Sequence, residues 1–201
     1  KGMSLLELIM VCAIILILSF SLIMTVMKAR YHAKTVACAN NLRQIGIAVQ
    51  LYLDDFEHRF PPCESTVPSD CWYTELDYYI DDPESFKCPG YEFHSYDFTD
   101  ASTRNFCSYG FNRSGLNESS AGYQLGKDIN YVTSPTKCMI ASEGSAGANP
   151  DNSVYYIDKN HLPIARHNNG VNVLFVDSHV RWMTRSSIPT SGSEAALWWN
   201  Y

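Results

Sequence analysis

No proline occurs before Pro61, and no charged residue lies between residues 8 and 27. Without proline, nothing in the first part of the chain removes a backbone donor and breaks a helix. Twenty uncharged residues in a helix span roughly 30 Å, which is the thickness of a bilayer core. This stretch therefore predicts a membrane-length helix. A plain membrane anchor and a cleaved signal peptide are the simpler alternatives.

Other absences exclude classes of protein. The net charge is −6 and no basic stripe is present, so we expect no nucleic-acid partner. No repeat and no low-complexity tract occurs, which argues against solenoid and fibrous classes. Apolar residues make up 46% of the chain and charged residues 18%, so the polar part is not disordered by composition.

The motifs of common enzyme classes are also missing. The sequence has no H-E-x-x-H, no nucleophile elbow and no phosphate-binding loop, and we expect no enzyme activity. An acid/base or metal site remains an alternative, because three histidines lie close in sequence to two aspartates. These residues are His161, His167, His179, Asp158 and Asp177.

Cysteines are frequent for a chain of this size. One of the seven, Cys12, lies inside the apolar run. The disulfide candidates are Cys38, Cys63, Cys71, Cys88, Cys107 and Cys138. No C-x-x-C pair occurs, which disfavours a zinc knuckle and favours disulfides formed outside the cytoplasm. The connectivity does not follow from sequence, but we expect Cys63 to pair with Cys71, since they flank a short loop rich in proline and serine.

The helical pattern continues beyond the apolar run. Apolar residues fall near one helical face at Leu42, Ile45, Val49, Leu53 and Phe56. One helix is therefore predicted over about residues 4–56, ended by Pro61 and Pro62. We expect a hydrophobic part over residues 1–27, an amphipathic continuation over 28–60 and a globular head over 61–201.

Short β-strands are predicted in the head. NFCSYGFN and KCMIAS have the composition of strands, and NVLFV and HVRWM are β-rich runs joined by a tight turn at Asp177–Ser178. The predicted fold class is α+β. A long N-terminal helix, hydrophobic and then amphipathic, packs on a small antiparallel sheet with long loops.

Glu7 is a single carboxylate at the start of the apolar run. A carboxylate in an apolar environment is costly unless it has a partner. Lys1 is the nearby cation in the chain. The new amine of Met3 would also serve, if the chain were cut after Gly2.

This N-terminus resembles that of type IV pilins and pseudopilins: Gly2, a hydrophobic residue, Glu7 and then an unbroken apolar helix. The resemblance implies that prepilin peptidase cuts between Gly2 and Met3 and methylates the new amine. Glu7 would be the fifth residue of the mature chain and an assembly residue. It would be unpaired in the monomer and pair with the N-terminus of a neighbouring subunit.

The rest of the chain resembles a group of pilin-like proteins with a C-terminal His-x9-Asp-Gly motif. His167 and Asp177 match this motif, and Ser178 stands at the usual glycine. CANNLRQIGIAVQLY at residues 38–52 and FKCP at residues 86–89 match further motifs of the group. Because serine tolerates a positive φ poorly, Ser178 weakens the requirement for a type I′ turn. We expect His167 to hydrogen-bond the hairpin or backbone, and His179 to cap the hairpin.

The resemblance implies a structural subunit of a type IV pilus-like filament. The alternatives are a pseudopilin of a type II secretion system and a membrane-tethered binding module that does not polymerise. The implied partners are copies of the same chain, prepilin peptidase and the pilus or secretion assembly machinery. The precursor would lie in the cytoplasmic (inner) membrane and the product in an extracellular filament at the cell surface.

No cofactor is expected from the sequence. A structural calcium ion is an alternative, because acidic residues occur near the end of the helix and in the following loop. These residues are Asp54, Asp55, Asp81, Asp82 and Glu84. No spaced calcium-loop pattern connects them, so the metal ligands are left unassigned.

Overall fold

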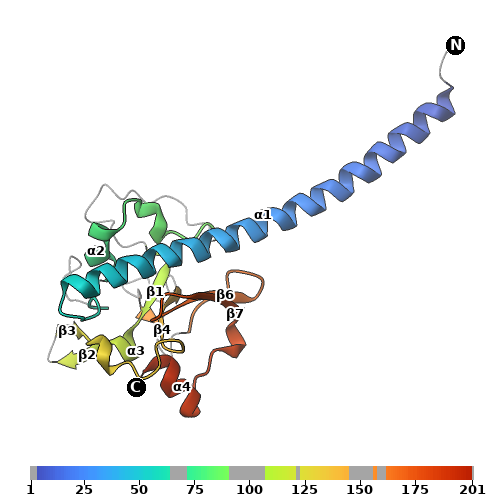
Figure 1. The fold of residues 1–201 in the computed structure, drawn as a ribbon. Coiled ribbons are helices and arrows are strands. Elements are labelled where there is room, and N and C mark those ends of the chain that lie inside the picture. Colours follow the sequence, from blue (N-terminus) through green and yellow to red (C-terminus); the bar gives the residue numbers. More distant parts are fainter. Residues whose placement is uncertain are drawn as a thin grey trace.

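A computed structural model of the chain describes residues 4–63, 72–90, 107–120, 123–144, 156–157 and 162–200. The expected α+β fold is confirmed (Figure 1). Helix α1 (Leu5–Asp55) has 51 residues, a length of about 76 Å at the usual rise per residue. Figure 1 shows its first half projecting away from the head, while its second half lies across the head.

Helix α1 ends within one residue of the predicted position, but not for the predicted reason. The helix ends at Asp55, ahead of both prolines. Glu57 and His58 have positive φ angles of 50° and 62°, and the His58 N–H donates to the Leu53 carbonyl (2.9 Å). A left-handed turn therefore ends the helix, and the expectation that the prolines end it is wrong. Phe56, expected on the buried face, is 46% exposed and stacks on Tyr52.

The head contains a five-stranded sheet in the order β5-β1-β4-β6-β7. Its strands are β1 (Tyr109–Asn112), β4 (Met139–Glu143), β5 (Tyr156–Ile157), β6 (Gly170–Phe175) and β7 (Val180–Thr184). All neighbouring pairs are antiparallel except β1 and β5, which pair parallel. A separate antiparallel pair is formed by β2 (Asn117–Ser120) and β3 (Tyr123–Gly126).

Short helices surround the sheet. They are α2 (Trp72–Leu76), η2 (Asp77–Tyr79), η3 (Pro83–Phe86), α3 (Arg113–Leu116), η4 (Ile129–Tyr131), η5 (Arg185–Ser187) and α4 (Gly192–Trp199). Helices α2, η2 and η3 contact the docked half of α1, and α4 covers the opposite face of the sheet. The sheet thus lies between α1 and α4.

Strand β6 shows how the sequence builds the two faces. Side chains alternate along a strand. Val171, Val173 and Phe175 belong to the apolar cluster with α4, whereas Leu174 belongs to the cluster with α1. Gly46 lets α1 approach β6 closely, because a Cβ atom there would lie 2.9 Å from Leu174 Cδ1.

The C-terminal tryptophans pack on their own head domain. Trp199 is fully buried and its Nε1–H donates to the Pro189 carbonyl (2.8 Å). Trp198 is 6% exposed and meets the ring of Phe175 edge-on. This packing fixes α4 against the β6 face and closes the second core.

The predicted β6–β7 hairpin is confirmed, with its tight turn at Asp177 and Ser178. The Ser178 N–H donates to the Phe175 carbonyl (2.8 Å), and the Phe175 N–H donates to the His179 carbonyl (3.0 Å). Ser178 has a φ of 68°, the left-handed conformation that follows a type I turn in a three-residue hairpin loop. Asp177 has no positive φ, so the turn is not type I′.

Candidate functional site

The free segment of α1, residues 4–30, has no buried or half-buried side chain. Tyr31 is the first residue of the helix with partial burial, and Cys38 is the first that is buried. Large apolar side chains in the free segment are highly exposed, including Ile17 at 69% and Phe20 at 68%. An exposed apolar surface of this extent marks a contact with lipid or protein.

Within the described residues, α1 is the one helix long and apolar enough to cross a membrane. The core helix of a soluble protein can have the same composition, but such a helix is mostly buried. None of the membrane-length window of α1 is buried. The same helix continues without a break into the head. A rigid rod thus connects an apolar surface to a folded domain.

Glu7 lies in the first turn of α1, and its Oε2 accepts the backbone N–H of Ser4 at 2.9 Å. A glutamate three residues after the N-cap position stabilises a helix start through this bond and through the helix dipole. One carboxylate oxygen of Glu7 is therefore hydrogen-bonded in the monomer, whereas the expectation that Glu7 has no charged partner there stays a prediction. Its partner is a neutral N–H group, however, so the carboxylate charge is not neutralised by this contact.

The processing residues lie outside the described part of the chain. Gly2 and Met3 are not described, and neither is Lys1. The cut between Gly2 and Met3, and the pairing of Glu7 with a cation, stay predictions.

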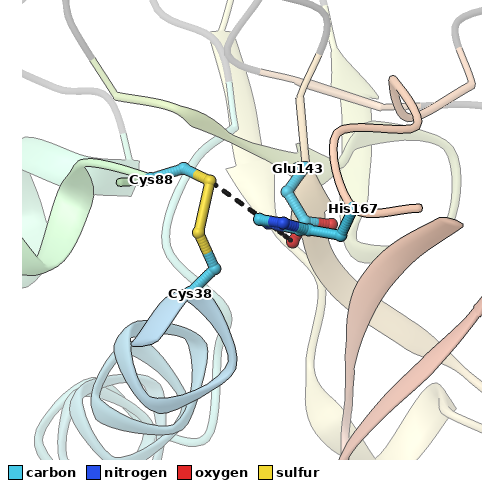
Figure 2. A group of neighbouring side chains, drawn as sticks. All are labelled: Cys38, Cys88, Glu143 and His167. Carbon is cyan, nitrogen blue, oxygen red and sulfur yellow. Dashed lines mark hydrogen bonds and ion pairs between the residues drawn. A yellow bond between two sulfur atoms is a disulfide. The ribbon is translucent and has the colours of Figure 1, made fainter. Parts of the chain in front are cut away.

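Four residues from separate segments meet inside the head (Figure 2). This buried cluster consists of Cys38 on α1, Cys88 after η3, Glu143 at the end of β4 and His167 before β6. Cys38 and Cys88 form a disulfide that closes a sequence separation of 50 residues. The predicted Cys63–Cys71 pairing cannot be compared, because Cys71 lies outside the described residues.

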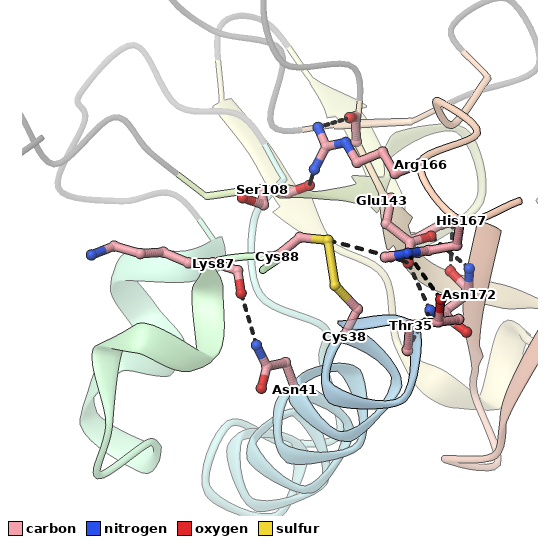
Figure 3. The surroundings of a disulfide bond; sticks show 12 residues. Thr35, Cys38, Asn41, Lys87, Cys88, Ser108, Glu143, Arg166, His167 and Asn172 are labelled. Carbon is pink, nitrogen blue, oxygen red and sulfur yellow. Dashed lines mark hydrogen bonds and ion pairs between the residues drawn. A yellow bond between two sulfur atoms is a disulfide. The ribbon is translucent and has the colours of Figure 1, made fainter. Parts of the chain in front are cut away.

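The polar half of the buried cluster is a histidine–carboxylate pair. His167 Nε2 lies 3.2 Å from Glu143 Oε1 and 3.4 Å from Cys88 Sγ, with no exposed side-chain surface on either residue of the pair. Asn172 donates its backbone N–H to Glu143 Oε2 (2.6 Å) and its side-chain Nδ2–H to Oε1 (2.9 Å). Both carboxylate oxygens are thus held in place (Figure 3).

The two ring nitrogens of His167 have different neighbours. Nδ1 lies 3.3 Å from the Thr35 hydroxyl oxygen, which also lies 3.2 Å from the Tyr31 carbonyl. Nε2 faces the Glu143 carboxylate. This buried contact is favourable with a proton on Nε2 or with a cation between the two atoms.

The segment that carries His167 is fixed on several sides. Arg166 donates to the carbonyls of Ser108 (2.8 Å) and Gly144 (2.7 Å). Trp182 Nε1–H donates to the His167 carbonyl at 3.0 Å. The backbone of His167 also exchanges two hydrogen bonds with Gly170, so its expected bonding to the hairpin backbone is present. The His167 ring, by contrast, contacts Glu143 and Cys88 in the buried cluster. The sequence did not predict this cluster.

The two residues of the C-terminal motif are not brought together. His167 pairs with Gly170 at the start of β6, and Asp177 lies in the turn after its other end. Asp177 Oδ1 accepts the His179 N–H at 3.3 Å, and the His179 ring contacts Asp177 and stacks on Phe175. His179 thus caps the hairpin as expected. His161 and Asp158 lie outside the described residues.

Two further cysteines in the head, Cys107 and Cys138, form no disulfide in the described part of the chain. Cys138 is fully buried, and burial raises the pKa of its thiol to about 12. Burial and then the Glu143 carboxylate also raise the pKa of Tyr109 above its ordinary value. Both groups are therefore neutral in the folded protein at physiological pH.

Three of the five acidic residues named for calcium have other partners. Asp55 accepts the Tyr79 hydroxyl at 2.8 Å, Asp82 accepts the Glu84 N–H at 3.0 Å, and Glu84 also pairs with Lys87. Among the described residues, only the buried cluster brings three or more metal-ligating side chains together. Glu143 carried no signal in the sequence beyond its place at the end of an apolar strand.

Comparison with known proteins adds no relative to these observations. No family model, no curated protein and no solved structure matches the chain.

Proposed function

We propose that the chain is a structural subunit of a type IV pilus-like extracellular filament, assembled by packing of N-terminal helices after cleavage by prepilin peptidase. The observation that carries the proposal is the division of α1. Every residue from 4 to 30 is exposed. Farther along the same helix, the buried residues between Cys38 and Leu53 pack on the head.

The free segment has two environments that suit its surface. In a bilayer its apolar side chains contact lipid over about the thickness of the hydrocarbon core. Outside the membrane they have to contact one another, because the head covers none of them. Helices from many copies of the chain can bury these surfaces together in a filament core, where van der Waals packing replaces contact with lipid.

The docked half of α1 supports this role by fixing the direction of the rod. Leu42, Ile45 and Val49 are fully buried against the head. Gln50 Nε2–H donates to the Val176 carbonyl at 3.2 Å, and Asn41 Nδ2–H donates to the Lys87 carbonyl at 2.8 Å. These contacts hold α1 at one angle to the head. Helices that pack in one orientation in a filament core therefore also place their heads in one arrangement around it.

Glu7 supports assembly through its charge. The Ser4 N–H satisfies one oxygen but leaves a net negative charge among apolar side chains. Such a charge is stable in an apolar core only beside a cation. The N-terminal amine of a neighbouring copy, freed by cleavage after Gly2, has the required charge and lies at the same end of its own helix.

Substitution of Glu7 separates helix capping from assembly. Glu7→Gln keeps an oxygen that accepts the Ser4 N–H but removes the charge, and Glu7→Ala removes both. We expect both variants to remain in the membrane fraction and to yield no filaments on shearing of the cells. Glu194→Gln, which removes an exposed charge on α4, is the matched control and should assemble normally.

Two outcomes would count against the proposal. Normal filaments from Glu7→Gln would reduce Glu7 to a capping residue. Wild-type chain found processed, but only in the membrane fraction, would favour a pseudopilin or a tethered module over an extracellular filament. Mass analysis of the N-terminal peptide from sheared material should give a chain that begins at methylated Met3.

A further inference from the structure

The buried cluster contains two sulfurs, an imidazole nitrogen and a carboxylate oxygen, all within 4.8 Å of one another. Zn²⁺ binds this set of donor types in proteins, with four ligands at the corners of a tetrahedron. We propose that the dithiol form of the chain binds one Zn²⁺ ion through Cys38 Sγ, Cys88 Sγ, His167 Nε2 and the Glu143 carboxylate. The site is independent of filament assembly.

The measured distances fit a tetrahedral ion. Bonds of about 2.0–2.3 Å place neighbouring ligand atoms about 3.3–3.8 Å apart. His167 Nε2 is 3.2 Å from Glu143 Oε1 and 3.4 Å from Cys88 Sγ. The large rearrangement is confined to Cys38 and Cys88, whose sulfurs have to separate from bonding distance. Their Cα atoms are 5.3 Å apart, so side-chain rotation provides much of that separation.

The surrounding hydrogen bonds already hold the ligands in the orientation that a metal needs. The Thr35 hydroxyl lies 3.3 Å from His167 Nδ1. In the metal-bound form it accepts the Nδ1–H, and Nε2 binds the ion. Asn172 holds both oxygens of Glu143. Metal-binding histidines and carboxylates in proteins are oriented by outer partners of this kind.

The charges of the ligands suit a divalent cation. The Glu143 carboxylate is buried beside the His167 ring, and a divalent cation offsets its charge while it also binds the two nearby sulfurs. Two thiolates and one carboxylate with Zn²⁺ leave one net negative charge. Arg166, the residue before His167, carries a positive charge, and its guanidinium donates to the Ser108 and Gly144 carbonyls (Figure 3).

The disulfide and the metal are mutually exclusive. A thiolate is the zinc ligand, and a sulfur in a disulfide carries no such charge. Each state joins the same segments, since Cys38 belongs to α1 and the other three residues belong to the head. Zn²⁺ binding to the dithiol releases the two thiol protons. In the reduced chain, the Zn²⁺ ion thus replaces the disulfide as the link between α1 and the head.

The test uses the full chain in detergent micelles. A phosphine reductant breaks the sulfur–sulfur bond and donates two electrons. Water supplies the two thiol protons and the oxygen of the phosphine oxide. After anaerobic removal of the reductant, the chain is titrated with Co²⁺ and then with Zn²⁺. We expect one Co²⁺ per chain, with the absorption bands of tetrahedral thiolate coordination, and its displacement by one Zn²⁺.

Variants identify the ligands. Glu143→Gln and His167→Gln should each weaken Co²⁺ binding by at least about 100-fold, and Cys38→Ser/Cys88→Ser should abolish it. The controls are His179→Gln, at a partly exposed histidine, and Glu194→Gln, at an exposed glutamate. Both should bind as the wild type does. Thr35→Val leaves all four ligands and should weaken binding about 10-fold, which keeps the test informative if a ligand variant does not fold.

Three results would overturn the proposal. The first is a reduced wild-type chain that binds Co²⁺ no more tightly than Cys38→Ser/Cys88→Ser. The second is equal binding by the wild type, Glu143→Gln and His167→Gln, which would show adventitious thiol binding. The third is an octahedral spectrum without sulfur charge-transfer bands. None of these results bears on filament formation, which the Glu7 variants test separately.

Discussion

His167 Nε2 lies 3.2 Å from Glu143 Oε1, and neither side chain reaches solvent. The two residues belong to different segments, since Glu143 ends β4 and His167 precedes β6. Asn172 on β6 bonds the same carboxylate, so the pair fastens the strand ends to each other. A partner removed from such a pair leaves a buried polar group that has no water to replace it.

The first prediction concerns this pair in the disulfide form. His167→Ala should lower the free energy of unfolding by about 3–5 kcal/mol, because it leaves the Glu143 carboxylate without its partner. His179→Ala is the control, since its ring is 40% exposed and its contact is with Asp177. It should cost less than about 1 kcal/mol. Denaturant unfolding of the oxidised chain with a chelator present measures both, and equal losses would contradict the role given to His167.

The second prediction compares two isoleucines two residues apart on α1. Ile45 is fully buried, and Ile47 is 59% exposed. Ile45→Ala should destabilise the head by about 2–5 kcal/mol through lost burial and a cavity. Ile47→Ala should change the stability by no more than about 0.5 kcal/mol. Denaturation of the micelle-bound monomer tests the pair. A large effect at Ile47 would mean that the docked face of α1 has been misplaced.

The periodic part of this helix was predictable from sequence. Leu42, Ile45, Val49 and Leu53 recur at helical spacing, and all four are buried. The approximate end of the helix was also predicted, but its cause was not, because the turn at Glu57 and His58 contains no glycine that would indicate its positive φ angles. Local sequence indicates which face is apolar. It does not indicate where tertiary contacts force an unfavourable backbone conformation.

The buried cluster was less predictable than the fold. Cys38 and Cys88 are 50 residues apart, and His167 and Glu143 are separated by the segment before β6. Their meeting depends on the order β4-β6 in the sheet and on α1 docking over it. The nine-residue spacing between His167 and Asp177 reflects only the length of β6, which separates the two residues. It gives no information about which distant segments meet.

The third prediction uses the turn of that hairpin. Ser178 has a φ of 68°, a conformation that costs a non-glycine residue roughly 1–2 kcal/mol. Ser178→Gly should relieve this strain, although glycine also gives the unfolded chain more conformational entropy. The net result should be a free energy of unfolding higher by about 0.5–1 kcal/mol. Ser186→Gly, at a position without a positive φ, should lower it instead. Thermal unfolding of the two variants against wild type measures the signs, and a loss at Ser178 would contradict the strain.

The last prediction concerns alkaline pH and Cys138. Burial raises the pKa of its thiol from 9.0 to about 12 in the folded state. The unfolded chain therefore loses this proton first as the pH rises. The contribution of the Cys138 thiol to the unfolding free energy is complete below pH 9. It is lost as the pH approaches 12, at up to about 1.4 kcal/mol per pH unit.

Cys138→Ala isolates this contribution, because the other groups with raised pKa values remain in both proteins. They are Tyr52, Tyr79, Cys107 and Tyr109. Between pH 9 and 11, the wild type should lose about 2 kcal/mol more of its unfolding free energy than Cys138→Ala does. Mass analysis under non-reducing conditions has to confirm that Cys38–Cys88 is retained at each pH. Parallel pH profiles for the two proteins would contradict this prediction. They would mean that the Cys138 thiol has the same pKa in the folded and the unfolded chain, although it lies in the apolar cluster between α1 and the sheet.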